Sequence, residues 1–462
     1  MKPCRPVTFV AILILFLAGA LGAHASDAPW QIGLACVSIT PEQPVWLYGY
    51  AGQNRFQPFT GKLDDLRAQA MAIQCPEGEL AVLITADLCV LRQPEEQELC
   101  EVLMRRTGLE RRQILLNWSH THSGPMIGTS DVNRYPIPEA DLQRTKAYTQ
   151  WLWNRLADVA QSALQDRQPA WLSWGVGRAE FVRNRRVLNA DGTYRRMGPN
   201  PEGPADKTVP VLRIDGPGGE RRGVLFGTAC HPVTLGGSNL KVSADFPGYA
   251  RQHLQQQYPG LVAMFVQGCG ADANPEPRAT ADQEDWVRRH GTLLGEEVVR
   301  VLSEPMQPVT GPLRVAFTRV DLPLASPPTR ERLEEMAKGP FWESHNARRI
   351  LAAQRQGQPL PDYYPTPLAL WQFGDSLTLV AISGEVVADY VPLAAAAVDS
   401  QPVWVAGYSN QVFGYLPSER ILREGGYETL GLVSAHIGWF SADAPKVLEQ
   451  ALGNLLDQPQ PQ

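Results

Sequence analysis

His120 and His122 are two imidazole side chains separated by one residue, within the segment 119–125 (SHTHSGP). Residues at spacing two share a face of a strand, and on a turn both side chains can approach one centre, which suits a metal ion. The alternative for such a pair is structural, with each histidine hydrogen-bonded inside the core. The other ionisable residues of the sequence therefore have to decide between the metal site and the structural interpretation.

Other ionisable side chains occupy comparable positions. His231, Asp272 and Glu385 each follow a short apolar run, in a turn that contains glycine or proline. Turns at the carboxyl ends of strands in an open α/β sheet converge on one crevice, so these residues are predicted to share a site with the histidine pair. The chain has eight histidines, and three of them lie at such positions, which favours metal binding.

His120, His231 and Glu385 would supply two neutral nitrogens and one carboxylate, the ligand set of a catalytic zinc site that keeps one position open for water. The ligand types alone do not separate zinc from manganese or iron. Zinc is expected because hydrolysis needs no redox change and zinc brings bound water to a pKa of about 7. A cysteine-based zinc site is excluded, because no two cysteines stand at CxxC spacing.

The elements that position these side chains are strands alternating with helices. Short apolar, β-prone runs alternate with amphipathic stretches, which is typical of an α/β protein with buried strands. No linker, charge block or repeat divides the chain, so we expect a single large catalytic domain over 26–457, with mixed β-sheets layered with α-helices. Strands are predicted at 80–85, 114–118, 224–229, 261–266, 313–320, 377–382 and 403–406, helices at 141–165, 247–257, 284–302, 330–337, 342–356 and 386–397, and irregular surface segments at 189–205 and 326–329.

The two ends of the chain are predicted to lie outside this domain. Lys2 and Arg5 precede an apolar run at 7–21 and a small-residue site ending at Ala25, the pattern of a secretory signal peptide over 1–25. The protein is therefore expected to be exported, to the periplasm or the medium. Residues 458–462 are expected to form a disordered tail.

Composition limits the partners and the state of the cysteines. The chain of 462 residues is 44% hydrophobic and has a net charge of −6, so its surface argues against nucleic acid as a partner. Cys89, Cys230 and Cys269 lie within or beside apolar runs and are expected to be buried free thiols.

The segment 119–125 resembles the histidine motif of the neutral/alkaline ceramidase family. Later elements follow in the family's order: Asn184-Arg185, the ACHP segment at 229–232, the GADANP turn at 270–275, Gly384-Glu385 and a tyrosine-bearing stretch at 407–428. The resemblance covers about 39–428. It implies a zinc-dependent amidase acting on ceramide or a related N-acyl lipid, with peripheral contact to a membrane.

Site roles follow from the resemblance residue by residue. The metal ligands would be His120, His231, Glu385 and Tyr415, with Tyr408 as the competing tyrosine because it stands nearer the end of a predicted strand. His122 and Tyr427 would stabilise the oxyanion or position the substrate, and Arg185 would bind the substrate's polar end.

The sequence also departs from the family pattern. The position of the family's serine falls on Asn274, which removes a serine nucleophile and leaves an amide to contact substrate. Asp272 remains to accept a proton or orient water, and the alternative is that it caps its own turn. The chain ends soon after Glu428, so the family's C-terminal β-sandwich domain is expected to be absent. Two alternative functions stay open: hydrolysis of another N-acyl, peptide or ester substrate, and binding without catalysis.

Overall fold

A computed structural model describes residues 30–50, 55–75, 78–130, 135–339, 341–398, 402–433 and 436–457. The signal peptide predicted at 1–25 and the tail predicted at 458–462 lie outside these residues, so both stay predictions. Among the helices of the described ranges, none has the length and apolar character needed to cross a membrane.

The strands form two large sheets and three small ones. The largest sheet has the order β12-β10-β9-β6-β1-β3-β4-β5, with β14 paired to β6, and the second has the order β15-β16-β17-β19. The strands are β1 Trp30–Ser38, β2 Gly61–Lys62, β3 Arg67–Gln74, β4 Leu80–Ala86, β5 Ile114–Trp118, β6 Gln168–Arg178, β7 Val182–Leu188, β8 Tyr194–Asn200, β9 Thr208–Asp215, β10 Arg221–Thr228, β11 Lys241–Val242, β12 Val262–Gln267, β13 Ala273–Pro275, β14 Gln307–Val309, β15 Leu313–Pro323, β16 Tyr363–Phe373, β17 Leu377–Ile382, β18 Glu385–Val386, β19 Val403–Ala406 and β20 Tyr415–Leu416.

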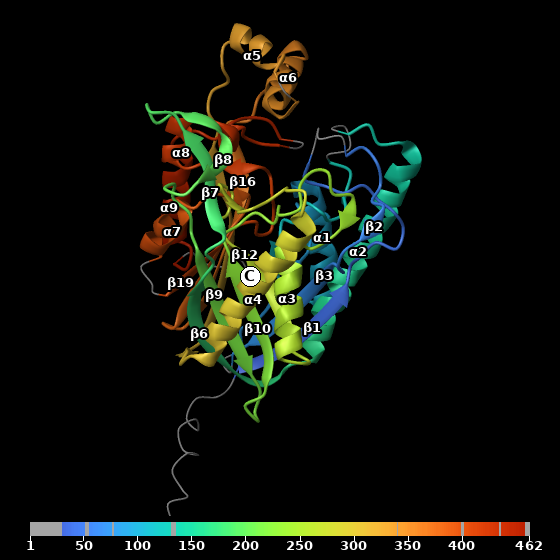
Figure 1. The fold of residues 1–462 in the computed structure, drawn as a ribbon. Helices are drawn as coiled ribbons and strands as arrows, with labels where there is room; N and C mark the ends of the chain where they lie inside the picture. Colours follow the sequence, from blue (N-terminus) through green and yellow to red (C-terminus); the bar gives the residue numbers. More distant parts are fainter. Residues whose placement is uncertain are drawn as a thin grey trace, which may run out of the picture.

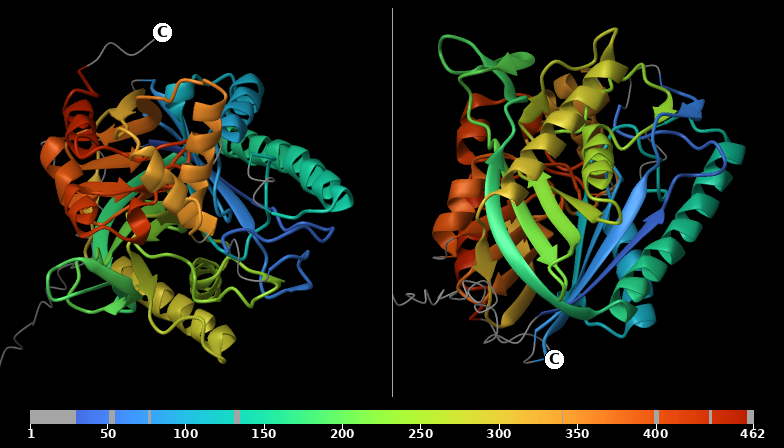
Figure 2. Two further views of the ribbon diagram at one scale, coloured as in Figure 1. Left: turned by 90° about the horizontal axis from the view of Figure 1, so that it is seen from above. Right: turned by 60° about the horizontal axis from the view of Figure 1, so that its bottom comes forward.

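The helices cover the outer faces of these sheets. Figure 2 shows the long helix α2 along the side of β1, while α3 packs against β12 and α4 against β6 and β9. On the other side of the molecule, α7 and α9 pack against β19 and β15. The helices are α1 Gln93–Thr107, α2 Glu139–Gln165, α3 Phe246–Gln257, α4 Gln283–Ser303, α5 Arg330–Met336, α6 Phe341–Arg355, α7 Tyr390–Ala397, α8 Glu419–Glu424 and α9 Ala444–Gly453.

Alternation along the strands produces the layers. In β3, Ala68, Ala70 and Ala72 share a buried cluster with α1 and α2, while Met71 and Ile73 share another with the second sheet. Successive side chains of a strand point to opposite faces, so a strand that is apolar throughout is buried on both. The result is a sandwich in the order helices, nine-stranded sheet, four-stranded sheet, helices, which confirms the predicted α/β class with mixed sheets.

One helical pair stands outside the layers. The hairpin of α5 and α6 is inserted between β15 and β16 and lies at the top of Figure 1, above the body of the sandwich. Its own small core contains Leu333, Ala347, Ile350 and Leu351. The side chain of Asn346 ties it to the body by donating to the carbonyl groups of three residues between 430 and 438.

The strands that carry the predicted site residues match the sequence prediction closely. β5, β17 and β19 have the predicted bounds, and β10 and β12 differ from them by one to three residues at each end. The prediction of an irregular segment at 189–205 is correct for 189–193 and 201–205 but wrong for 194–200, where β8 pairs with β7. β8 is polar and largely exposed, so it has no apolar pattern that the sequence could reveal. The segment 326–329 is irregular, as predicted.

Candidate metal centre

Three side chains from distant parts of the chain converge after the ends of β5, β10 and β17. Nε2 of His120 lies 3.3 Å from Oε2 of Glu385, and Nε2 of His231 lies 3.2 Å from the same oxygen. The three ligand atoms lie within 4.8 Å of one another, and all three residues are buried. The shared site that the strand-end turns predicted is thus present in the geometry.

The spacing of these atoms fits a tetrahedral ion. Ligand atoms about 2.0–2.2 Å from a tetrahedral zinc ion are separated from one another by about 3.3–3.6 Å. The two contacts of Glu385, at 3.2 and 3.3 Å, lie at the short end of this range. The donor set of two imidazole nitrogens and one carboxylate is also the one that borderline divalent metals such as zinc accept. His120, His231 and Glu385 therefore fit a zinc ion.

Hydrogen bonds on the outer side of each imidazole fix which nitrogen faces the centre. Nδ1 of His120 lies 2.6 Å from the carbonyl oxygen of Cys89, and Nδ1 of His231 lies 2.7 Å from that of Gly270. A carbonyl can only accept, so each Nδ1 carries the proton and each Nε2 is directed inward. A metal-binding histidine is usually oriented in this way by a second hydrogen bond.

The backbone is strained where it places these groups. His120 has a φ of 65°. For a residue with a side chain, this conformation costs on the order of 1–3 kcal/mol, and residues strained in this way cluster at functional sites. Gly384, directly before Glu385, has a φ of 93°. A Cβ at Gly270 would lie 2.4 Å from the backbone nitrogen of Cys230, so only glycine lets the turns after β10 and β12 approach closely.

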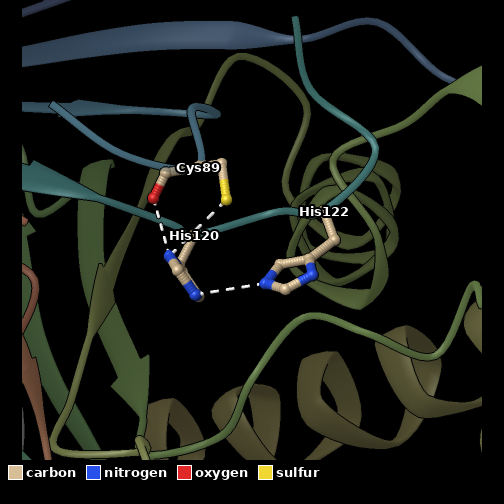
Figure 3. Close-up of side chains that lie close together, drawn as sticks. All are labelled: Cys89, His120 and His122. Atoms are coloured by element: carbon tan, nitrogen blue, oxygen red, sulfur yellow. Dashed lines mark hydrogen bonds between the residues drawn. The ribbon is translucent and has the colours of Figure 1, made fainter. Parts of the chain in front are cut away.

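His122 is directed at the same point from another side. Figure 3 shows its ring beside His120, with the two Nε2 atoms 3.2 Å apart. Cys89 contacts the outer nitrogen of His120, at 3.8 Å from its sulfur, so Cys89 and His122 face different sides of this ring. The Cys89 thiol is therefore placed to support His120 rather than to share a metal with it.

Electrostatics separate the roles of the three imidazoles. Burial and the neighbouring Arg185 lower the pKa of His231 to about 3. Burial, together with His120 and His231, also holds the pKa of His122 well below its ordinary value. Burial opposes the charge of His120 too, but Cys89 and Glu385 raise its pKa overall to about 10. Of the three imidazoles, His120 is therefore the one whose positive charge its neighbours, Cys89 and Glu385, favour most.

Tyr415 and Tyr408 occupy different positions relative to the centre. Tyr415 is the backbone partner of Glu385 in the pairing of β18 with β20, lines the cavity described below and accepts a hydrogen bond from Arg185 at 3.1 Å. The hydroxyl of Tyr408 instead lies 3.5 Å from Nδ1 of His231, the nitrogen that faces outward. This geometry favours Tyr415 as the fourth ligand.

Arg185 belongs to a buried network beside the centre. Its Nε donates to Glu428 at 2.8 Å, its Nη1 to Asn274 at 3.4 Å, and its guanidinium group lies 5.5 Å from the ring centre of Tyr427. The rings of Tyr415 and Tyr427 are 5.3 Å apart. Arg185, Asn274 and Tyr427, which the sequence predicted at the site, are thus brought together around Tyr415.

Asp272 lies away from the cavity. Its carboxylate accepts from the backbone nitrogen of Ala388 at 3.0 Å and from Asn184 at 3.2 Å, and it lies 3.5 Å from Arg420. Burial raises the pKa of Asp272 to about 6. These contacts give Asp272 a structural role, but not the predicted capping of its own turn: it holds the turn after β12 against the segment that follows Glu385.

Glu428 and Arg186 were not recognised from the sequence. Glu428 is fully buried and bonds to both Arg185 and Arg186, and Arg186 also bonds to Glu424 at 3.0 Å. Two adjacent arginines in a segment without an apolar pattern predict a solvent-exposed surface rather than a buried ion pair. The Asn184-Arg185 element was the nearest sequence signal.

The cluster opens into a cavity of about 900 Å³. The predicted residues His120, His122, Arg185, His231, Asn274, Glu385, Tyr415 and Tyr427 all line it. Met336 of α5 lines it too, together with Leu430, Leu432 and Trp439, so the helical hairpin and the segment beneath it supply an apolar part of the wall. Such a space can hold an extended, mostly apolar ligand against the polar cluster.

The six cysteines of the described ranges are free, and all except Cys36 are buried. The predicted buried thiols Cys89, Cys230 and Cys269 are confirmed. Burial raises the pKa of Cys269 well above its ordinary value, so it has no character of a nucleophile.

Together, the fold and the site define an αββα protein whose strand ends hold a two-histidine, one-carboxylate centre. Residues 30–285, more than half of the chain, match the family model described as neutral/alkaline non-lysosomal ceramidase, N-terminal, and the chain belongs to this family.

Two curated relatives are similar over part of their length. Neutral ceramidase B of Dictyostelium discoideum is 27% identical over 267 residues, which is 55% of this chain and 36% of the relative. Neutral ceramidase of Pseudomonas aeruginosa is 26% identical over 335 residues, 68% of this chain and 48% of the relative. The matched region thus spans between one third and one half of these proteins.

Solved structures share the fold over most of the chain. A structure titled "Ceramidase complexed with C2" matches with a TM-score of 0.73 and 18% identity, over 93% of this chain and 75% of the other. The crystal structure of neutral ceramidase from Pseudomonas aeruginosa matches with a TM-score of 0.71 and 19% identity, over 93% and 74%.

Proposed function

We propose that this protein is a zinc-dependent amidohydrolase that cleaves the amide bond of ceramide or a related N-acyl lipid and releases a fatty acid and an amine. The observation that carries the proposal is the convergence of His120, His231 and Glu385, at the spacing of metal ligands, within a cavity that also has an apolar wall. Membership of the ceramidase family supports the substrate class.

His120, His231 and Glu385 would hold the zinc ion, with Tyr415 as the fourth ligand. When bound, zinc supplies Lewis-acid polarisation of the amide carbonyl and lowers the pKa of a coordinated water. The other side chains of the site would bind and orient the substrate and stabilise the negative charge that develops on it. The low pKa of His122 leaves its imidazole neutral, with one N–H that can donate to the carbonyl oxygen as negative charge develops there.

Tyr427 and Arg185 extend this polar surface. Tyr427 packs against Tyr415 and can donate its hydroxyl hydrogen to the same oxygen or to the substrate's polar end. Arg185 is held in place by Glu428, so its charge faces the cavity in a fixed position. Asn274 shares its oxygen with Arg185 and leaves its amide nitrogen to contact substrate.

The location of the protein is part of the proposal. The charged, apolar and small-residue segments of 1–25 support export through a cleaved signal peptide, and the apolar wall of the cavity is consistent with substrates drawn from a membrane surface.

The test is amide hydrolysis by the purified protein with a fluorescent N-acylsphingosine as the substrate. Release of fatty acid should stop after treatment with a chelator and return when zinc is added, while magnesium should not restore it. His120→Ala is the matched protein control and should show no release in either state. Undiminished release by chelated protein that contains no metal would contradict the zinc-dependent mechanism.

A further inference from the structure

Part of the cavity wall beside His122 carries Arg278, a cation that has no counter-ion among the residues that the structure describes. Arg278 lines the cavity and donates from Nε to the carbonyl oxygen of Val233 at 3.1 Å. Among the described residues, no carboxylate forms an ion pair with Arg278. Two other arginines of the cavity are different, because Arg185 is paired with Glu428 and Arg332 with Glu335.

A second arginine, Arg55, does not line the cavity itself but contacts two residues that do, His122 and Tyr50. Arg55 is only 4% exposed, and its Nη1 donates to the carbonyl oxygen of His122 at 2.7 Å. Its Nε and Nη2 have no hydrogen-bond partner within the described structure. Burial lowers the pKa of Arg55 to about 10, which still leaves it charged at neutral pH. A buried charge without a partner is costly, so this region is poised to accept negative charge.

Tyr50 connects the two arginines to the centre. Its ring lies 4.8 Å from the ring of His122 and 5.4 Å from the guanidinium carbon of Arg55. The hydroxyl of Tyr50 donates to the carbonyl oxygen of Leu235 at 2.7 Å, and Arg278 lies close enough to this hydroxyl to oppose the rise in its pKa that burial causes. Tyr50 and Arg278, which line the cavity and are here called the cationic wall, thus adjoin the polar cluster, and Arg55 adds its charge from behind Tyr50. Met336, Leu430 and Trp439 supply the apolar wall of the same cavity.

We propose that the cationic wall binds an oxyanion group on the amine portion of the substrate, so that the preferred substrates are anionic N-acyl amides such as N-acylated amino acids. This rests on the proposed amidase function and narrows its substrate class. The acyl chain of such a substrate needs an apolar surface, which the apolar wall supplies. The amine portion of the substrate would then lie against the cationic wall. A charge-assisted hydrogen bond from a guanidinium group such as that of Arg278 is short and strong.

The experiment compares three amides with the same twelve-carbon acyl chain. N-dodecanoylglycine carries a carboxylate, N-dodecanoyltaurine a sulfonate, and N-dodecanoylethanolamine no charge. With the zinc-loaded full chain, we expect kcat/KM to be at least about ten-fold higher for one or both anionic amides than for the ethanolamide. The carboxylate and sulfonate arms distinguish which oxyanion fits.

The variant Arg278→Gln tests the residue directly. It should lose at least about ten-fold more kcat/KM on the preferred anionic amide than on the ethanolamide, and Arg278→Lys should recover part of this loss. Arg330→Gln is the matched control: it removes an arginine of α5 that is paired with Glu334 on the surface, away from the cavity lining. Calorimetry on chelator-treated protein gives a second readout, in which Arg278→Gln should weaken binding of the anionic amide by a similar factor.

Failure of this proposal is distinct from failure of the amidase function. Equal or better turnover of the ethanolamide, with Arg278→Gln affecting all three amides alike, would overturn the anion site while keeping the amidase. If no amide is hydrolysed, N-acylsphingosine included, the amidase function is wrong. In that case, charge-selective binding lost in Arg278→Gln would support the anion site, and binding without charge selectivity would overturn it.

Discussion

Asn117 forms two hydrogen bonds with the backbone of Gln267. Its Oδ1 accepts from the nitrogen of Gln267 at 2.8 Å, and its Nδ2 lies 3.3 Å from the oxygen of the same residue. β5 and β12 stand at opposite ends of the strand order of the large sheet, so this side chain joins its two edges. The turns that follow β5 and β12 are thereby held at one end of the sandwich.

Asn117→Ala should therefore weaken both the fold and the centre. The buried nitrogen of Gln267 would lose its partner, while the carbonyl oxygen of Gly407 would keep Ser409, so the expected cost is about 1–3 kcal/mol of unfolding free energy. Urea unfolding measures this loss, and metal analysis should show less bound zinc. Asn154→Ala, on the exposed face of α2, is the control and should change neither.

His120→Ala and His122→Ala should have different consequences. We expect His120→Ala to abolish turnover and to lower the zinc content, because it removes a ligand. His122→Ala should keep the metal and lose about 10²–10³ in kcat, the effect of removing one oxyanion donor. Zinc analysis beside steady-state kinetics separates the two roles. Zinc loss in His122→Ala would show instead that its Nε2, 3.2 Å from that of His120, is itself a ligand.

Tyr415→Phe and Tyr408→Phe distinguish the two tyrosines. Tyr415→Phe should weaken zinc binding by roughly 10–100-fold or more and lower turnover, because its hydroxyl would be the fourth ligand. Tyr408→Phe should have the smaller effect, since its hydroxyl faces the outer nitrogen of His231 and its ring, 4.5 Å from that of His120, is retained. Competition with a chromogenic zinc chelator gives both affinities. The opposite order would make Tyr408 the ligand.

Glu428→Gln should be strongly destabilising. The variant removes the buried negative charge shared by Arg185 and Arg186, and loss of one partner from a buried ion pair typically costs about 3–5 kcal/mol. Thermal or urea unfolding measures the change. Glu419→Gln breaks an exposed pair with Arg423 and should be nearly neutral, as surface ion pairs usually are. Similar stability of the two variants would show that the buried network is not charge-dependent.

Asp64 should give the protein's stability a pH dependence of its own. Asp64 is buried, accepts hydrogen bonds from Ser243 and Ala244, and burial raises its pKa from 3.8 to about 7. Between these two values the unfolded chain releases the proton while the folded protein keeps it. The unfolding free energy contributed by Asp64 therefore falls as pH rises from about 4 to 7, by up to about 4 kcal/mol in all.

Asp64→Asn removes this titration while keeping a side chain that can hydrogen-bond to both neighbours. The stability of the native protein minus that of the variant should thus decrease as pH rises from 5 to 8 and change little above it. Urea unfolding at pH 5, 6, 7 and 8 measures this difference, in which the other titrating groups cancel. A difference that is constant with pH would show that Asp64 stays ionised in the folded protein.

The sequence predicted the strands that carry the site because burial left a signal in them. β5 and β17 are apolar or buried along their whole length and lead into turns with His or Glu, so both the element and its functional end can be recognised. β7 and β8 carry no such pattern, and their pairing depends on each other rather than on an apolar face.

The same contrast, between residues that have a local sequence signal and residues that do not, applies within the site. His120, His231 and Glu385 could be proposed because imidazole and carboxylate at strand ends are informative side chains. The pairing of Arg186 with Glu428, or of Asn117 with Gln267, could not, because each joins residues far apart in the chain through contacts that leave no local pattern. The orientation of each imidazole, which the carbonyl groups of Cys89 and Gly270 fix, could not be predicted either, for the same reason.

The hairpin of α5 and α6 leaves and re-enters the second sheet at neighbouring residues, since Pro323 of β15 is paired with Tyr363 of β16. A segment anchored in this way can be lengthened, shortened or exchanged at small entropic cost and without altering the register of the strands beneath it. Because Met336 of this segment lines the cavity, changes confined to the insertion would remodel the substrate space while the metal ligands stay in place. Exchange of this one connection would therefore reshape the apolar part of the cavity while the cluster of His120, His231 and Glu385 stays unchanged.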